Sequence, residues 1–167
     1  MDNQISIAIS PEEKLVKILK DKKYHISFAE SCTGGLAAAT LVSVADASSV
    51  FAESIVTYSK EAKIKYLGVK KEIIEFCGTV SEDVAGAMAQ GVCNLTGAEI
   101  GVGITGVAGP TGGTPEKPVG TVCFGFTING KVTTKTVNFE DVGRNNVRES
   151  AVTYVFRTLS HLLENEN

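Results

Sequence analysis

This sequence has few histidines, a nearly balanced charge and no long apolar run. Its 167 residues include two histidines, and 16 basic against 19 acidic side chains leave a formal net charge of −3. No strongly basic face is indicated, which argues against a nucleic-acid partner. The uncharged stretch that comes nearest to a membrane span, residues 31–45, contains several Gly, Ser and Thr residues and falls short of the roughly 20 apolar residues that a span needs. We therefore expect neither a nucleic-acid-binding protein nor a membrane protein.

The sequence also lacks the cysteine spacing of a zinc or redox site. Its four cysteines, Cys32, Cys77, Cys93 and Cys123, form no CxxC pair. The N-terminus shows no basic run followed by an apolar core and a small-residue cleavage site, so no signal peptide is expected. These absences predict reduced thiols, no metal, no cofactor and a cytoplasmic location.

Enough apolar material is present to form one hydrophobic core. Hydrophobic residues make up 43% of the chain and charged residues 21%, a balance typical of globular proteins. A chain of this length suits one ordinary domain and is too short for two. We expect a single domain over residues 1–167, with flexible ends at residues 1–10 and 164–167.

Apolar spacing and cap residues predict an alternation of helices and strands. Ser10-Pro11 with Glu13 forms a capping box for the first helix, and Asn129-Gly130 is a strong hairpin signal. Further helices are expected over residues 36–45, 60–67, 82–95 and 145–163, and strands over 25–29, 51–59, 99–105, 119–127 and 131–138. Alternating elements followed by a late hairpin predict an α/β fold: a single three-layer domain whose mixed β-sheet carries helices on both faces.

Three loops that follow predicted strands contain unusual residues, and ligands of open α/β sheets gather at the carboxyl ends of strands. The first loop, residues 30–35, reads Glu-Ser-Cys-Thr-Gly-Gly. Free N–H groups at a helix start attract anions and can stabilise an oxyanion, which makes Ser31 a candidate nucleophile. The alternative is that Ser31 or Thr33 only caps the helix.

The second loop, residues 57–63, offers the base that a serine nucleophile needs. His25 and His161 lie outside the glycine-rich loops, and we expect both to be solvated or packed. A lysine can serve when burial or a nearby cation lowers its pKa, which makes Lys60 and Lys63 candidates. The alternative for both lysines is a solvated helix face.

The third loop, residues 105–120, is rich in glycine and proline, with five glycines and three prolines between positions 106 and 120. So many glycines indicate a backbone kept clear for a ligand, and Lys117 would add charge for a phosphate. The loop matches neither the Walker motif nor GxGxxG. A plain surface loop is the alternative, although loops longer than ~12 residues are uncommon in compact domains unless they bind something.

Taken in order, these loops resemble the C-terminal domain of the competence/damage-inducible (CinA) protein family. The resemblance covers about residues 12–163 and is carried by segments 29–35, 57–63, 78–81, 106–110 and 117–122. Larger members of that family carry an N-terminal domain that resembles molybdopterin-binding proteins. With about ten residues ahead of the first predicted helix, we expect that domain to be absent here.

The resemblance implies a nicotinamide mononucleotide deamidase, which releases ammonia and nicotinate mononucleotide in pyridine nucleotide salvage. It implies Ser31 as the nucleophile, Lys63 as the base and Tyr58 as an assisting residue. Cys32 is a competing nucleophile, because a thiol is more acidic than a serine hydroxyl and Cys32 adjoins the same helix start, and the resemblance ranks it second. The implied substrate-binding residues are Cys32, Thr33, Gly34, Gly35, Thr105, Gly106, Arg144 and Arg148, and one of the two arginines would hold the phosphate. The family commonly has an acidic residue just before the first arginine, whereas this chain has Gly143.

Two interpretations of other classes are weighed against an enzyme. A nucleotide-binding or phosphate-binding module without turnover would explain the glycine loops and arginines, because phosphate binding needs neither Ser31 nor Lys63. An interaction protein would leave the loop at residues 106–120 unexplained. The family tendency predicts a homo-oligomer, a dimer or larger.

Overall fold

The capping pattern at Ser10 starts the first helix of the fold. Ser10 Oγ accepts a hydrogen bond from the Glu13 N–H (3.3 Å), and the Glu13 carboxylate accepts one from the Ser10 N–H (2.9 Å). Helix α1 (Pro11–Lys22) follows and buries Leu15 and Leu19, as its helical spacing predicts. The structure, a computed structural model, describes residues 8–166.

The remaining elements build one mixed sheet between helices. After α1 come β1 (Ile26–Glu30), α2 (Leu36–Val42), the 3-10 helix η1 (Ala47–Ser49), β2 (Phe51–Val56), α3 (Lys60–Leu67), α4 (Lys71–Cys77), α5 (Glu82–Thr96), β3 (Ile100–Gly106), β4 (Thr121–Ile128), β5 (Lys131–Asn138) and α6 (Arg144–Glu164). The strand order is β2-β1-β3-β4-β5. β1 is parallel to β2 and β3, while β4 is antiparallel to β3 and β5. The predicted α/β fold with a mixed sheet is confirmed.

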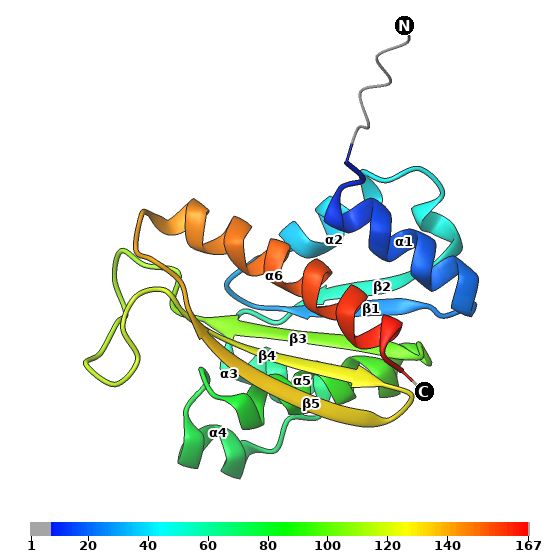
Figure 1. Ribbon diagram of the computed structural model, residues 1–167. Helices are drawn as coiled ribbons and strands as arrows, with labels where there is room; N and C mark the ends of the chain where they lie inside the picture. The colour runs from blue at the N-terminus through cyan, green and yellow to red at the C-terminus, as the bar shows by residue number, and fades with distance from the viewer. Residues whose placement is uncertain (1–7, 167) are drawn as a thin grey trace, which may run out of the picture.

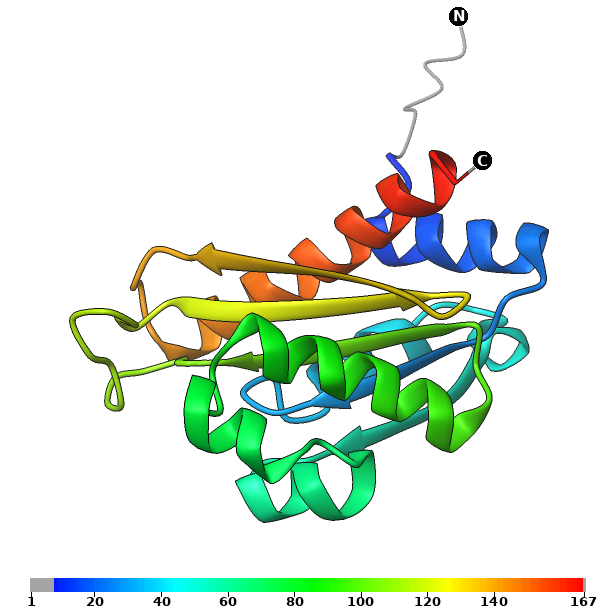
Figure 2. The same ribbon diagram turned by 90° about the horizontal axis from the view of Figure 1, so that it is seen from below.

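Helices cover both faces of the sheet, in three layers (Figure 1). α1, α2 and α6 lie on one face, and α3, α4 and α5 lie on the other, which Figure 2 shows from below. Each face of the sheet packs against its helices in a separate hydrophobic cluster. β1 contributes to both clusters, because Phe28 packs in the cluster under α6 and Ala29 in the cluster under α5. None of the described helices has both the length and the apolar character needed to cross a membrane.

Element boundaries differ from the predictions at a few points. β2 ends at Val56 rather than at residue 59, because Ser59 caps α3 by accepting a hydrogen bond from the Ala62 N–H. α2 is shorter than predicted and ends at Val42. Helix α4 was not predicted at all. It has one buried residue, Ile74, and no side-chain cap, so its sequence carries neither an apolar period nor a start signal.

The carboxyl ends of the three parallel strands meet at one edge of the sheet. β2 and β3 flank β1, so the chain leaves β1 toward β2 and later returns to its other side. Such a reversal point is where open α/β sheets bind ligands. The loops after Glu30, Val56 and Gly106 therefore converge at the left edge in Figure 1, where α6 begins and the 107–120 loop projects.

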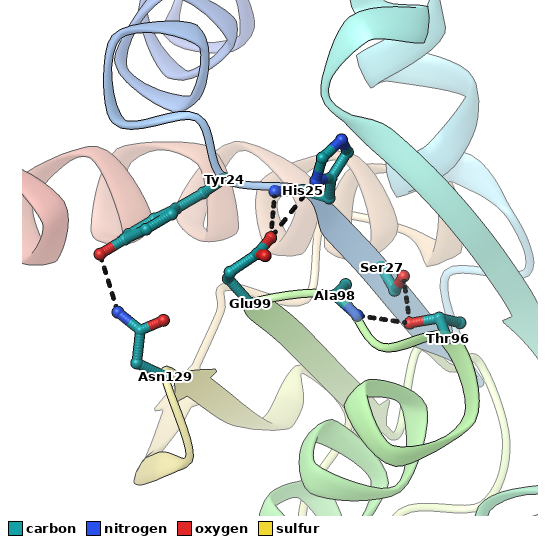
Figure 3. A network of polar contacts seen from close by, with 7 residues as sticks. All are labelled: Tyr24, His25, Ser27, Thr96, Ala98, Glu99 and Asn129. Atoms are coloured by element: carbon teal, nitrogen blue, oxygen red, sulfur yellow. Dashed lines mark hydrogen bonds and ion pairs between the residues drawn. The ribbon is translucent and has the colours of Figure 1, made fainter.

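The opposite edge of the sheet is tied by a separate polar network (Figure 3). Glu99 accepts hydrogen bonds from the His25 backbone N–H (2.7 Å) and lies 3.3 Å from His25 Nδ1. Asn129, in the hairpin turn, donates to the Tyr24 hydroxyl (2.8 Å). His25 is thus an exposed residue that joins β1 to β3 at the end away from Ser31, and it cannot serve Ser31 as a base.

The predicted flexible ends fall partly outside the described residues, which exclude residues 1–7 and 167. Within the described part, Ser10 caps α1 and Glu164 is the last residue of α6. Lys14 pairs with Glu164 (2.8 Å), and Lys22 pairs with Glu166 (3.2 Å). These ion pairs fasten the end of α6 to α1.

Two glycines let α5 lie directly on the sheet. A Cβ atom at Gly103 of β3 or at Gly125 of β4 would overlap the backbone carbonyl oxygen of Ala85 in α5. Because that neighbour is backbone, it cannot rotate away as a side chain would. The close packing of α5 on β3 and β4 therefore depends on glycine at these positions.

Replacing Gly103 tests this packing. Gly103→Ala should destabilise the fold by about 2–3 kcal/mol, because the added methyl group forces α5 away from the sheet. Urea denaturation followed by far-ultraviolet circular dichroism measures the change. An unaltered denaturation midpoint would contradict the close approach.

Candidate active site

Ser31 and Lys63 lie in contact although they are far apart in the sequence. Lys63 Nζ is 3.0 Å from Ser31 Oγ. Ser31 directly follows β1, and Lys63 lies in the first turn of α3, which leaves the adjacent strand β2. Ser59 fixes the start of α3 by accepting a hydrogen bond from the Ala62 N–H (3.1 Å). The parallel pairing of β1 and β2 thus brings the two side chains together.

The Lys63 amine is buried without a carboxylate partner. The residue is 1% exposed, and none of the ion pairs among residues 8–166 includes it. Burial lowers the pKa of Lys63 from 10.5 to about 8, because the charged form loses its hydration. Its Nζ also donates to the Thr57 carbonyl (2.6 Å), which holds the amine in place. Near neutral pH, an appreciable fraction of Lys63 is an uncharged amine that can accept a proton.

Lys60, the other lysine candidate, has the environment of a solvated residue. It is exposed and lies 3.8 Å from Glu61 in a surface ion pair. The lining residues of the cavity beside Ser31 do not include it. The structure therefore favours Lys63 over Lys60 as the base.

Cys32 lies beside Ser31 but is poorly suited to be the nucleophile. Burial raises the pKa of the Cys32 thiol from 9.0 to about 11. The thiolate is the reactive form of cysteine, and little of it exists at neutral pH with such a pKa. The argument that cysteine is the more acidic residue is therefore offset by its surroundings. All four cysteines are free.

A cavity of about 190 Å³ opens beside the serine and the lysine. Its lining residues are Ser31, Cys32, Tyr58, Lys63, Thr79, Val80, Thr105, Gly106, Ala108 and Arg144. All three predicted loops contribute to it, together with the turn before α5. Of the predicted site residues, Thr33, Gly34, Gly35 and Arg148 are not among those that line it. Thr79, Val80 and Ala108 line the cavity although no role was predicted for them.

The two arginines at the start of α6 face different groups. Arg144 lines the cavity, and it donates to the Gly109 carbonyl (2.7 Å) and the Tyr58 hydroxyl (3.1 Å). Arg148, one turn later, donates to the carbonyls of Cys32 (3.1 Å) and Thr33 (2.9 Å). Arg144 thus joins the second and third loops beside the cavity, while Arg148 holds the first loop.

Glu30, which the sequence analysis did not single out, fixes the start of α2. Its carboxylate is fully buried and accepts hydrogen bonds from the N–H groups of Gly35 (3.0 Å), Ala37 (3.1 Å) and Ala38 (3.0 Å), and from Ser54 Oγ (3.3 Å). The helix-start amides that were expected to attract a ligand anion are therefore bound by the protein's own carboxylate. A glutamate at the last position of a fully buried strand was the available signal, because buried carboxylates need partners.

Two more amides of the serine turn are also engaged. The Ser31 N–H donates to the Ile104 carbonyl (3.0 Å), and the Gly34 N–H donates to the Ser31 carbonyl (3.1 Å). Within the part of the chain that the structure describes, the N–H groups of Cys32 and Thr33 have no oxygen acceptor. Of the amides in this turn, which were expected to stabilise an oxyanion, those of Cys32 and Thr33 therefore remain available as donors.

Lys117 supports the cavity wall and does not line the cavity. Its Nζ donates to the Cys77 carbonyl at the end of α4 (2.9 Å). Thr105, which does line the cavity, also holds this wall, since its hydroxyl donates to the Thr79 carbonyl (2.8 Å). The predicted phosphate role of Lys117 does not fit this placement, because its amine already holds the segment that leads into the Thr79–Val80 wall.

Among residues 8–166, the larger hollows along α5 and α6 are not lined by a serine beside a buried lysine. One of about 730 Å³ runs along α6 beside Phe139, Tyr154 and His161. None of the predicted site residues lines it. His161 Nδ1 lies 3.3 Å from Asn165 Nδ2, which fits the expectation of a solvated or packed histidine. The chemistry of the lining residues, and not the volume, identifies the candidate site.

Comparison with known proteins agrees over nearly the whole chain. The family model of the CinA C-terminal domain matches residues 8–163. The chain is 50% identical over 151 residues to a putative competence-damage inducible protein of Alkaliphilus oremlandii, covering 90% of this chain and 36% of that protein. It is also 50% identical over 145 residues to a CinA-like protein of Kosmotoga olearia, covering 87% of this chain and 35% of that protein. The chain thus spans little more than a third of the length of these curated relatives.

Solved structures share the fold. A CinA superfamily protein from Klebsiella pneumoniae superposes with a TM-score of 0.90 at 33% identity, covering 93% of this chain and 97% of that one. A competence/damage inducible protein from Agrobacterium tumefaciens gives a TM-score of 0.86 at 38% identity, covering 91% and 94%. The α/β architecture described above is therefore that of solved relatives along almost their full length.

The role of Glu30 can be tested through stability. Glu30→Gln replaces a carboxylate oxygen by an N–H₂ group that cannot accept hydrogen bonds from the α2 amides. We expect a loss of about 3 kcal/mol in the free energy of unfolding, measured by urea denaturation. The exposed Glu53→Gln, on the neighbouring strand β2, is the matched control and should change stability by less than about 0.5 kcal/mol. Equal stability of the two variants would contradict the role given to Glu30.

Proposed function

We propose that this chain, which belongs to the CinA C-terminal domain family, is an amidohydrolase that converts nicotinamide mononucleotide into nicotinate mononucleotide and ammonia. The observation that carries the proposal is the 3.0 Å contact of Ser31 Oγ with the buried amine of Lys63 beside a cavity. The family resemblance of the three loops suggests the substrate. The geometry supports the nucleophile and the base.

In the first step, Lys63 activates Ser31. The uncharged amine accepts the proton of the Ser31 hydroxyl, and Oγ attacks the carboxamide carbon of the substrate. A C–O bond forms while the carbonyl electron pair moves onto its oxygen. The Thr57 carbonyl accepts one N–H of the amine, which leaves the lone pair free to face Ser31.

In the second step, ammonia leaves and water completes the reaction. The Lys63 ammonium returns its proton to the amide nitrogen, the C–N bond breaks, and an ester of Ser31 remains. A water molecule then gives a proton to Lys63 and attacks the ester carbon. Ser31 recovers its proton as the carboxylic acid departs, so that the net change is amide plus water to acid plus ammonia.

The cavity and Arg144 support a small substrate with an anionic end. At about 190 Å³, the cavity is smaller than the ~300–1,000 Å³ common for drug-sized ligands, so it suits the reacting end of a nucleotide and not the whole molecule. Arg144 lies at the cavity wall, where paired N–H donors suit a phosphate. Tyr58, 64% exposed and in contact with Arg144, extends this wall outward.

A binding module without turnover explains the site less well. Phosphate binding would use Arg144 but would gain nothing from a buried lysine without a carboxylate partner. Burying such an amine costs free energy, because its charged form loses hydration. An uncharged buried amine can accept a proton from Ser31, which a catalytic site needs and a binding module does not. We therefore favour catalysis.

Loss of the nucleophile should abolish turnover. With nicotinamide mononucleotide as substrate, Ser31→Ala should lower kcat at least roughly 10³-fold in an ammonia-release assay, with an unchanged circular dichroism spectrum. The exposed Ser48→Ala is the control and should retain wild-type activity. Activity retained in Ser31→Ala and lost in Cys32→Ala would instead assign the nucleophile to the thiol.

The pH dependence should report the titration of Lys63. Because the uncharged amine is the active form and burial lowers its pKa to about 8, kcat/KM should rise with pH and level off above about pH 8. Below that value, activity should fall about tenfold per pH unit as the amine becomes protonated. A midpoint near 10.5, the ordinary lysine value, would contradict the role of burial.

A further inference from the structure

We infer that Arg148 is a positioning residue: it fixes the peptide group that joins Cys32 to Thr33, so that the Thr33 amide can donate to the reacting oxygen. The inference rests on the proposed amide hydrolysis. It separates Arg148 from Arg144, which lies one turn earlier on the same helix and lines the cavity.

The guanidinium of Arg148 is occupied by the protein itself. Its Nε donates to the Cys32 carbonyl (3.1 Å) and its Nη2 to the Thr33 carbonyl (2.9 Å), while Nη1 donates to Asn145 Oδ1 (3.0 Å). Each nitrogen of the planar group therefore has a protein acceptor. Two donors on successive carbonyls hold a turn far more rigidly than the single point contact of a lysine could.

Holding the Cys32 carbonyl also orients the N–H group of Thr33. The Cys32 carbonyl and the Thr33 N–H belong to one planar trans peptide group and point to opposite sides of it. When Arg148 holds the carbonyl, the Thr33 N–H must point away from Arg148. The guanidinium charge also polarises this peptide in the sense that strengthens its N–H as a donor.

The Cys32 and Thr33 amides are the ones that remain for a ligand. Glu30 binds the Gly35 amide, and the Ser31 and Gly34 amides donate to backbone carbonyls. Among residues 8–166, no oxygen accepts from the amides of Cys32 and Thr33. Hydrogen bonds from both amides lower the pKa of the Cys32 thiol against the larger, opposite effect of burial. Both amides therefore face the Cys32 side chain, and Cys32 lines the cavity next to Ser31. A carbonyl oxygen that becomes negative during attack by Ser31 would find its donors here.

Arg144 provides the natural contrast. Its partners are the Gly109 carbonyl and the Tyr58 hydroxyl, so none of its hydrogen bonds reaches the Ser31 turn. An effect of Arg144 on the reaction should therefore come through substrate binding, and an effect of Arg148 through the rate of the chemical step.

The first experiment compares Arg148→Lys with Arg144→Lys on two substrates, nicotinamide mononucleotide and nicotinamide riboside, which carries the same amide but no phosphate. Arg148→Lys should lower kcat about 10²–10³-fold by a similar factor for both substrates, with little change in KM. Arg144→Lys should raise KM for the nucleotide more than for the riboside. Arg157→Lys, exposed on the same helix, is the control and should match wild type. A selective rise in KM for the nucleotide in Arg148→Lys would overturn the inference.

A milder variant guards against loss of fold. Asn145→Ala removes only the Nη1 partner of Arg148, and Asn145 is exposed. It should lower kcat several-fold while KM stays unchanged. If Arg148→Lys unfolds and Asn145→Ala behaves as wild type, the positioning role is wrong.

The second experiment needs no natural substrate. An uncharged alkyl fluorophosphonate reacts with Ser31 by forming a P–O bond as fluoride leaves and Lys63 takes the hydroxyl proton. Arg148→Lys should slow this labelling strongly, and Arg157→Lys should not. If the wild type is labelled but releases no ammonia from nicotinamide mononucleotide, that substrate is excluded, and the labelling rates still test the role of Arg148. If Arg148→Lys is labelled as fast as the wild type, the inference is overturned. Neither labelling nor turnover in the wild type would overturn both.

Discussion

The contact of the Lys63 amine with Ser31 Oγ and the Thr57 carbonyl is the constraint on which the site depends. A buried lysine is costly to keep charged, and this one has no carboxylate partner among the described residues. Its surroundings therefore favour the uncharged amine, and the two oxygens that flank Nζ determine where its lone pair points. In the proposed reaction the serine hydroxyl gains a base by this means without histidine, of which the chain has two, and neither lines the cavity beside Ser31.

The fold around this contact holds the loops of the site in fixed positions. Parallel pairing of β1 with β2 and β3 brings three loops to one edge of the sheet, and charged side chains then fix each loop. Glu30 binds the amides at the start of α2, Arg148 binds carbonyls of the same turn, and Lys117 binds the end of α4. Arg144 also joins two loops, through the Gly109 carbonyl and the Tyr58 hydroxyl, but of these four charged residues it alone lines the cavity. An arrangement of this kind keeps the reacting groups in place before the substrate arrives.

Much of the architecture could be predicted from local patterns. The capping box at Ser10, the Asn129-Gly130 turn and the alternation of helices with strands all lie where their spacing indicated. Ser31 could be named as a candidate, with Lys60 or Lys63 as its base, because loops after parallel strands converge, and the family resemblance then selected Lys63. The roles of Arg148, Lys117 and Glu30 could not be predicted, because each depends on a contact with a distant backbone group that no sequence spacing encodes. The same holds for α4, whose single buried residue leaves no period, and for Gly103, whose need for glycine appears only when α5 lies against it.

The most direct measurement of the central claim is the titration of Lys63 itself. Nuclear magnetic resonance of protein labelled with ¹³C at lysine Cε can follow each amine as pH changes, and Lys63→Arg assigns the signal of interest. Our account predicts a midpoint near 8 for Lys63, set by burial, while exposed lysines titrate near 10.5. A Lys63 signal that titrates with the exposed lysines would show that the amine stays charged, and a serine activated by this lysine would then be ruled out.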